Sequence, residues 1–274
     1  MTTRAPMIEQ RPFDAAASLY DQEFDGHRPT VRLRQIMMKL FLRYFPIHSS
    51  LLELNCGTGT DAIALANHRM TVYATDDSPA MVSSAREKVS MAGLTSHIIV
   101  DRLAFDQLDQ LRGKVFDGVY SNFGGLNCVP DLSSIAADVS VLLKPGGFFV
   151  LCVMTDFSIW ETTAFLLRLR WQSAFRRLRR DGVDARVHET TLRIYYHSPD
   201  SIRSAFEPWF ELVEMGGLSV FTPPPGATKA NRVLRPIIPL LDLLDNAVYR
   251  WYPFRRIGDH CYIVMRRTTR ESLA

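Results

Sequence analysis

The stretch that most constrains this chain is residues 51–66, LLELNCGTGTDAIALA. A short apolar strand pattern runs through a glycine-rich turn at Gly57 and Gly59 into a helical pattern. This order begins a nucleotide-binding βα unit, in which glycines let the backbone approach the ligand without a Cβ atom. The glycines alone do not decide which nucleotide binds, because a single G-x-G-x-x-G pattern is a weak signal and its sixth position here is Ala62.

Strands and helices alternate beyond this turn. Apolar strand patterns lie at residues 51–55, 71–75, 97–101, 116–121 and 148–154, mostly separated by helical patterns or polar loops. Such alternation predicts parallel strands joined by crossover helices. In an open parallel sheet the ligand binds at the carboxyl ends of the strands, so chemistry is expected in the loops there.

Two helix starts can be identified from single residues. Ser78 is a natural N-cap, with Pro79 at the first helical position. Asp131 is expected to cap the helical pattern of residues 132–143, which ends at the glycines of KPGG.

Composition narrows the class of protein. A chain of 274 residues, 47% of them hydrophobic and 22% charged, can bury a full core. Its net charge of +3 does not by itself indicate nucleic-acid binding. The four cysteines lack zinc or redox spacing and no signal-peptide pattern is present, so reduced thiols and a cytoplasmic location are expected. The apolar residues 236–249 are too few to span a bilayer.

Polar residues at the end of the first strand discriminate between two nucleotide ligands. Glu53 and Asn55 precede the glycines, whereas in a dinucleotide fold the strand runs directly into the first glycine. A carboxylate suits a cationic ligand better than a pyrophosphate. S-adenosylmethionine carries a sulfonium and an ammonium group, so these residues favour it over NAD.

Several motifs in order resemble those of the class I, Rossmann-like S-adenosylmethionine-dependent methyltransferases. They are LELNCGTGTDAIALA, VYATDDSPAMVSSA, FDGVYSNFGGLNC and LLKPGGFFVLCVM, and the resemblance covers roughly residues 13–154. It implies an α/β fold: a doubly wound, mostly parallel seven-stranded sheet with helices on both faces and a substrate cap formed by insertions.

The same resemblance implies a domain plan. N-terminal helices in residues 1–48 cover the donor site, and residues 49–154 form the donor-binding core. Residues 155–198 are a cap insertion. Residues 199–274 complete the core sheet and contain a second insertion at 218–258.

The donor site implied by the resemblance surrounds the carboxyl ends of the first four strands. Asp76 closes the second strand, where an acid accepts both ribose hydroxyls. Leu103 stands where the family usually has an acid that reads adenine, so backbone groups or Asp106 are the alternatives. The donor-binding candidates are Tyr20, Glu53, Asn55, Gly57, Thr58, Gly59, Asp76, Asp77, Met81, Leu103, Ala104, Asn122, Phe123 and Gly124.

Acceptor chemistry is less constrained. The loop SNFG after the fourth strand lacks the prolines of base-amine methyltransferases, which disfavours nucleic acid as substrate. Cys152 lies in an apolar strand and is interpreted as a core thiol. Asn127 and Trp160 are expected to contact the acceptor. His260, at the start of the last strand, is preferred over His188 and His197 as a general base.

The first insertion carries an apolar stripe at helical spacing and a run of arginines. The stripe, which predicts one helix from Phe157 through Trp160 to Leu178, would either cover the sheet or line an acceptor pocket. The arginines between 168 and 180 are usually a solvated face, although an anionic substrate, a lipid surface or RNA would also explain them. A strand-like stretch, ARVHETTLRIYYH, follows.

These features predict an enzyme that transfers a methyl group from S-adenosylmethionine to a small or medium-sized, partly apolar acceptor. The product would be S-adenosylhomocysteine, and no metal is required. The alternatives are an RNA or protein methyltransferase that uses the arginine run, or a non-catalytic binder of the donor or of NAD.

Overall fold

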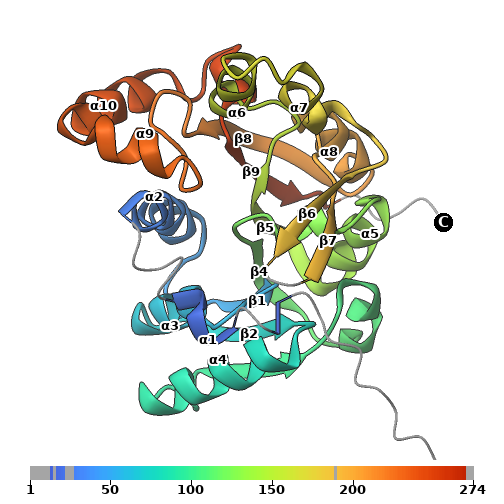
Figure 1. Ribbon diagram of the computed structural model, residues 1–274. Coiled ribbons are helices and arrows are strands. Elements are labelled where there is room, and N and C mark those ends of the chain that lie inside the picture. Colours follow the sequence, from blue (N-terminus) through green and yellow to red (C-terminus); the bar gives the residue numbers. More distant parts are fainter. Residues whose placement is uncertain (1–12, 15–16, 22–27, 188–189, 270–274) are drawn as a thin grey trace, which may run out of the picture.

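The computed structural model describes residues 13–14, 17–21, 28–187 and 190–269. Its centre is a seven-stranded sheet of order β3-β2-β1-β4-β5-β9-β8 (Figure 1). The first five strands are parallel, and β9 runs antiparallel between β5 and β8. The strands are β1 (Ser50–Leu54), β2 (Thr71–Asp76), β3 (Ile98–Arg102), β4 (Phe116–Ser121), β5 (Leu143–Met154), β8 (Phe210–Leu218) and β9 (His260–Arg267). The predicted fold class is confirmed.

The chain order reverses between β1 and β4, which lie side by side in the sheet. This switch point leaves a crevice beyond the carboxyl ends of the two strands, because their following segments turn to opposite faces. The five strands predicted from the sequence are all present, most with bounds shifted by a residue.

Helices cover both faces of the sheet with separate apolar cores. On one face, α2 (Arg28–Tyr44), α3 (Thr60–Asn67) and α4 (Pro79–Met91) contribute Leu33, Ala62 and Val82 to a buried cluster. On the other face, α5 (Ser133–Leu142) and α8 (Pro199–Phe206) contribute Ile135 and Phe206. The short α1 (Ala17–Tyr20) packs against α4. Short 3-10 turns lie at Phe105–Leu111, Gly125–Cys128, Arg176–Leu178 and Arg235–Ile237.

Of the two predicted helix starts, the one at Ser78 is confirmed, whereas the N-cap predicted at Asp131 is wrong, because Leu132 is the N-cap there and its side chain makes no cap hydrogen bond. Ser78 caps α4 by accepting the backbone N–H of Met81 at 3.2 Å, with Pro79 as the first helical residue. Asp131 accepts the N–H of Ser133 at 2.9 Å, although the helix begins only at Ser133. The stretch KPGG belongs to β5 and not to a loop, because β5 pairs with β4 across a register shift there.

The first insertion differs from the single helix predicted from its apolar stripe. It forms α6 (Ile159–Leu166), α7 (Trp171–Ala174) and the 3-10 turn, followed by a hairpin of β6 (Val183–Val187) and β7 (Thr190–Ile194). The helix breaks because Leu169 adopts a left-handed backbone conformation, with φ 55°. Trp171 and Leu178 are exposed as a result, so the stripe does not pack as one buried face.

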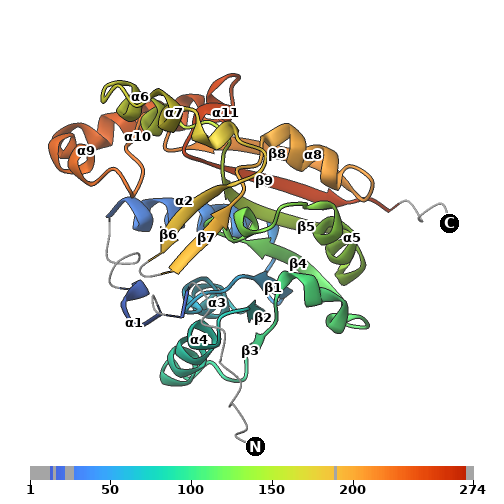
Figure 2. The same cartoon turned by 45° about the vertical axis from the view of Figure 1, so that its right-hand side comes forward.

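The second insertion lies at the same end of the molecule as the first (Figure 2). It contains α9 (Thr228–Val233), α10 (Ile238–Val248) and α11 (Phe254–Ile257). In the part of the chain that the structure describes, no helix is long and apolar enough to cross a membrane.

Candidate functional site

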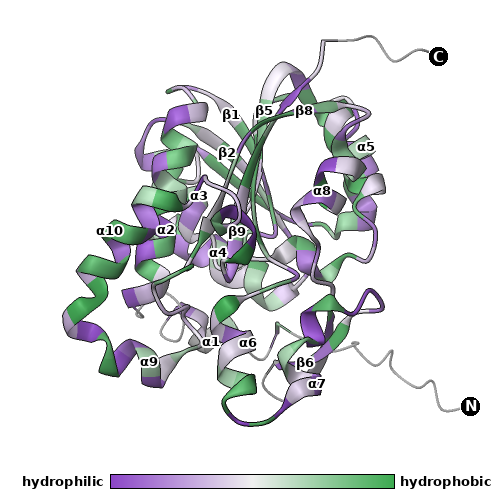
Figure 3. Ribbon diagram, turned by 90° about the horizontal axis from the view of Figure 1, so that it is seen from above, coloured by the Kyte–Doolittle hydropathy of each residue, from purple (hydrophilic) through white to green (hydrophobic). Residues whose placement is uncertain are grey.

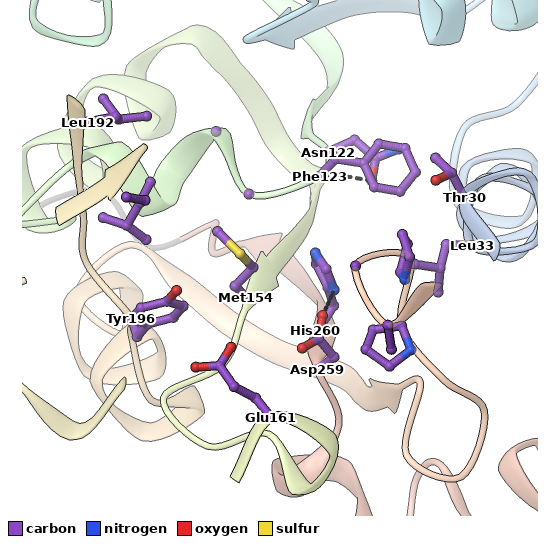
Figure 4. A pocket seen from close by; sticks show the side chains of 18 of the residues that line it. Thr30, Leu33, Asn122, Phe123, Met154, Glu161, Leu192, Tyr196, Asp259 and His260 are labelled. Atoms are coloured by element: carbon purple, nitrogen blue, oxygen red, sulfur yellow. Dashed lines mark hydrogen bonds and ion pairs between the residues drawn. The ribbon is translucent and has the colours of Figure 1, made fainter. Parts of the chain in front are cut away.

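A cavity of about 970 Å³ lies beyond the carboxyl ends of the parallel strands. Its floor is made by residues at the ends of β1, β2, β4 and β5, among them Glu53 and Asp76. Figure 4 shows Asn122 and Met154, which follow β4 and end β5. A smaller cavity of about 160 Å³ shares Asp76 with it and extends past the end of β3. The sequence-predicted position of the site at this edge of the sheet agrees with these cavities.

The glycine-rich turn is held open by Asp76. The N–H of Gly57 donates to Oδ2 of Asp76 at 2.8 Å, and the N–H of Ser78 donates to Oδ1 at 3.0 Å. Gly57 has φ +53°, and a Cβ atom there would meet only the Tyr20 ring, at 3.8 Å. Gly59, at φ +78°, instead faces Ala85, where a Cβ would lie 3.2 Å from the Ala85 methyl. Gly57 therefore borders the cavity, while Gly59 lets α3 pack on α4.

Buried carboxyl groups concentrate at this end of the cavity. Glu53 is 2% exposed, and its Oε2 has no hydrogen-bond partner among the described residues. Burial and the neighbouring Asp61 carboxylate raise the pKa of Glu53 well above its ordinary value. Asp61 itself pairs with Arg34 and accepts from Asn122 Nδ2 at 2.8 Å. A buried acid with one unpartnered oxygen beside an open cavity fits a cationic ligand such as S-adenosylmethionine.

Two predicted donor-binding side chains are used to hold loops. Asn55 Nδ2 donates to the backbone oxygen of Asn122 at 2.9 Å, and Asn55 Oδ1 accepts from Ser121 Oγ at 2.6 Å. The side chain of Asn122 donates through Nδ2 to Asp61 and accepts the N–H of Phe123 through Oδ1. Both residues line the cavity, yet their amides fix the loops after β1 and β4.

The remaining donor-binding candidates divide between the two cavities. Tyr20, Thr58, Met81, Phe123 and Gly124 line the large one. Asp77, Leu103 and Ala104 line the small one together with Phe105 and Leu108, which makes a narrow apolar slot. Asp106, the alternative adenine contact, is not among its lining residues. Phe13 and Cys128, which border both cavities, were not among the candidates, although Cys128 ends the motif FDGVYSNFGGLNC.

The two insertions enclose the far side of the large cavity. Trp160 and Phe165 come from α6, Ile194 and Tyr196 from the hairpin and the chain after it, and residues 224–230 from the second insertion. Trp160 Nε1 is buried and has no hydrogen-bond partner among the described residues. This end of the cavity combines aromatic and apolar side chains with the charged Glu161, Arg168 and Arg176, and the Trp160 N–H is a buried donor that a ligand could use.

Asn127, expected to contact the acceptor, lies beneath the cavity instead. Its side chain is fully buried and is not part of the lining. Nδ2 donates to the backbone oxygens of Met154 and Tyr195 at 3.0 and 2.8 Å, and Oδ1 accepts from the N–H of Met154 at 2.9 Å. The residue therefore ties β5 to the chain after the hairpin, and both N–H groups of its amide are used within the protein.

His260 lines the cavity and lies next to a buried charged network. Its Nδ1 is 3.0 Å from Oδ2 of Asp259, at an angle outside that of a well-formed hydrogen bond. Oδ1 of Asp259 accepts from Arg177 at 2.7 Å and from Ser158 at 3.0 Å. Arg177 also donates to Glu161 at 2.9 Å. Figure 4 shows Asp259 next to the imidazole of His260, which is directed toward the cavity.

This network fixes the protonation of Asp259. Burial alone would raise its pKa, but the contacts with His260 and the Arg177 guanidinium outweigh burial and lower it well below the usual range. Asp259 is therefore ionised, and its carboxylate lies 3.0 Å from Nδ1 of the imidazole. The sequence did not predict that Asp259 pairs with Arg177, because the two residues lie 82 positions apart.

The other reactive side chains singled out from the sequence lie elsewhere. His197 Nε2 is 2.9 Å from the backbone oxygen of Val129 and does not line the cavity. His188 lies outside the described residues. Cys152 is a core thiol whose pKa burial raises to about 12, and all four cysteines are free. No metal-binding cluster of His, Cys, Asp or Glu occurs within the described ranges.

Comparison with known proteins places the core in a family. Residues 51–147 match a family model described as a methyltransferase domain. Over 107 residues the chain is 31% identical to an S-adenosyl-L-methionine-dependent Diels-Alderase of Talaromyces variabilis, covering 39% of this chain and 36% of that protein. The chain thus spans about a third of the length of this curated relative.

Two solved structures share the fold over nearly the whole chain. An S-adenosylmethionine-dependent methyltransferase from Clostridium acetobutylicum has a TM-score of 0.61 at 13% identity, covering 94% of this chain and 100% of that one. The 4+2 cyclase SpnF has a TM-score of 0.62 at 15% identity, covering 93% of each chain.

Replacing Asp76 by Asn is expected to weaken binding of S-adenosylhomocysteine at least about tenfold, because charge-assisted hydrogen bonds are worth about 1.5–3 kcal/mol each. Isothermal calorimetry measures the affinity. Asp117→Asn is a matched control, since Asp117 accepts the N–H of Ser50 at 2.8 Å at the opposite end of the sheet. If both variants bound S-adenosylhomocysteine equally well, Asp76 would not contact the donor.

Glu53 also predicts a pH dependence of stability. Since its pKa is raised on folding, the folded state keeps the proton to a higher pH than the unfolded state does. Stability contributed by Glu53 therefore falls as pH rises from the ordinary carboxyl pKa toward the raised one. Glu53→Gln cannot ionise, so the ligand-free variant should melt above the wild type at mildly alkaline pH and bind donor more weakly.

Scanning calorimetry at mildly acidic and mildly alkaline pH measures this difference. The exposed Glu87→Gln variant should follow the wild type at both. If Glu53→Gln did not melt above the wild type at alkaline pH, the negative charge of Glu53 would be stabilised by other groups in the ligand-free protein.

Proposed function

We propose that the protein is a class I methyltransferase that transfers a methyl group from S-adenosylmethionine to a small or medium-sized, partly apolar acceptor, as the match of residues 51–147 to a methyltransferase domain supports. The observation that carries the proposal is the single cavity that joins the acidic donor end to the apolar space under the insertions. Its volume, about 970 Å³, is at the upper end of the ~300–1,000 Å³ usual for ligand pockets, which supports room for two ligands.

The donor end would be held by this chain's loops. The backbone at Gly57 would lie against the methionine part and Asp76 would accept the ribose hydroxyls, while Leu103 and Ala104 would border the adenine. Glu53 and Asp61 would balance the positive charge. When bound, S-adenosylmethionine supplies an electrophilic methyl group.

The acceptor end would bind an apolar body that carries at least one oxygen. Met154, Phe165 and Tyr196 supply apolar contact. The unsatisfied Trp160 N–H can donate to an oxygen of the acceptor, which would remove the cost of leaving a buried donor unpaired. Enclosure by both insertions keeps water from the reacting atoms.

His260 would remove the proton from a hydroxyl or carbon acceptor. Nε2 would take this proton, because Nδ1 lies beside the ionised Asp259. The positive charge that the imidazole gains would be stabilised by that carboxylate. Arg177 and Ser158 would keep Asp259 in place.

The alternative that the protein methylates RNA or protein by means of an arginine-rich helix loses support. Arg176 and Arg177 turn inward and pair with Glu161, so the arginines do not form one continuous face. A second candidate is a cyclisation in which S-adenosylmethionine is bound and not consumed. It is favoured by the similarity to a protein named as a Diels-Alderase and by the apolar cavity.

Methyl transfer is tested by incubating the protein with methyl-tritiated donor and a cell extract. Label should enter an organic-extractable metabolite, and His260→Asn should lower the rate by about 10²–10⁴ while leaving affinity for S-adenosylhomocysteine unchanged. Label in RNA or protein would contradict the proposed acceptor class. Conversion of a substrate to an isomer of equal mass, without consumption of donor, would establish cyclisation instead.

The same assay tests the Trp160 N–H. Trp160→Phe keeps an aromatic wall but removes the donor, so turnover should fall about tenfold for a lost hydrogen bond of about 1.4 kcal/mol, with the melting temperature nearly unchanged. Trp171→Phe is the control, because Trp171 is 62% exposed. Full activity in Trp160→Phe would exclude the indole from acceptor binding.

A further inference from the structure

Helix α10 is oriented opposite to an ordinary surface helix, which turns its apolar face to the core. Its Asp242 pairs with Arg32 at 2.9 Å, and Asp245 accepts backbone hydrogen bonds from the loop after β8. Its leucines point away from the protein: Leu240 is 56% and Leu243 65% exposed. The helix is thus attached by its polar side, and no described residue buries Leu240 or Leu243.

More apolar side chains are exposed on the two insertions, at the end of the molecule where α6, α7, α9 and α10 lie (Figures 1 and 2). Figure 3 shows apolar residues along α10 and on the chain just beyond α6. Single exposed apolar residues are ordinary, whereas a group of this size indicates an interaction site. We call this group the cap surface: Leu167, Leu169, Trp171, Leu240, Leu243 and Trp251.

The charges around the cap surface are positive. In the described part of the chain, Arg168, Arg179, Lys229 and Arg232 form no ion pair with a carboxylate. The acids of the same segments are already neutralised, as Glu161 is by Arg176 and Asp242 by Arg32. Two copies of this surface would bring like charges together, so self-association is disfavoured.

We propose that the cap surface docks on a bilayer that contains anionic phospholipid, with the leucines of α10 in the interface. Apolar residues beside unpaired arginines match this environment, and tryptophan is enriched at the level of the head groups. The surface adjoins the cavity, because Leu167 lines the cavity as well. An apolar acceptor could therefore pass from the bilayer to the site; that last step rests on the proposed function, whereas membrane binding does not.

Flotation with vesicles measures the binding. The wild type should float with vesicles of phosphatidylcholine and phosphatidylglycerol in equal parts, and not with phosphatidylcholine alone. Added salt should weaken the association, because the attraction of exposed charges is screened. Wild-type protein that floats with neither kind of vesicle would overturn the proposal.

Two sets of variants locate the surface. Leu240→Ser with Leu243→Ser should lower vesicle affinity at least about tenfold, and Arg179→Gln with Arg232→Gln about fivefold for each cation removed. Met91→Ser with Val141→Ser is the matched control on α4 and α5, with side chains 82% and 55% exposed. It should float like the wild type.

Unchanged flotation of the leucine variant would overturn the assignment of α10. The proposal would also be overturned if the wild type formed a dimer in solution, did not float with vesicles, and became a monomer in the leucine variant. The cap surface would then bind a second copy of the protein. Vesicle binding without methyl transfer would leave the docking surface standing and refute only the proposed function.

Discussion

The carboxylate of Asp76 is the interaction on which the donor end of the molecule depends. One oxygen receives the N–H of Gly57 and the other the N–H of Ser78, so a single side chain connects the turn after β1, the end of β2 and the start of α4. Burial raises the pKa of Asp76, while the two backbone hydrogen bonds oppose that rise. The turn is thereby held in a left-handed conformation that only glycine adopts without strain.

A second constraint connects the insertions to the sheet. Arg177, buried in the first insertion, bonds to Asp259 at the start of β9 and to Glu161 on α6. Removing one partner of a buried ion pair leaves an uncompensated charge, which is strongly destabilising. The position of the cap and the environment of His260 are therefore set by the same guanidinium, and acceptor enclosure and proton removal are coupled in the proposed reaction.

Local patterns explain why so much of the donor end could be predicted. The glycine turn and the Ser78 cap each depend on residues within a few positions of one another, and Asp76 was identified by its place at the end of the second strand, although its bond to Gly57 spans 19 residues. The pairing of Arg177 with Asp259 and the use of Asn127 as a brace depend on the tertiary fold, and no spacing indicates them. The break at Leu169 was likewise missed, since the apolar stripe continues through it.

The central claim is that the cavity at the switch point takes a cationic sulfonium donor and not a dinucleotide. Equilibrium dialysis of labelled S-adenosylmethionine, in competition with unlabelled NAD, measures this most directly. The buried Glu53 and Asp61 predict saturable binding of the donor that excess NAD does not displace. Displacement of the donor by NAD, or binding of NAD alone, would contradict the account.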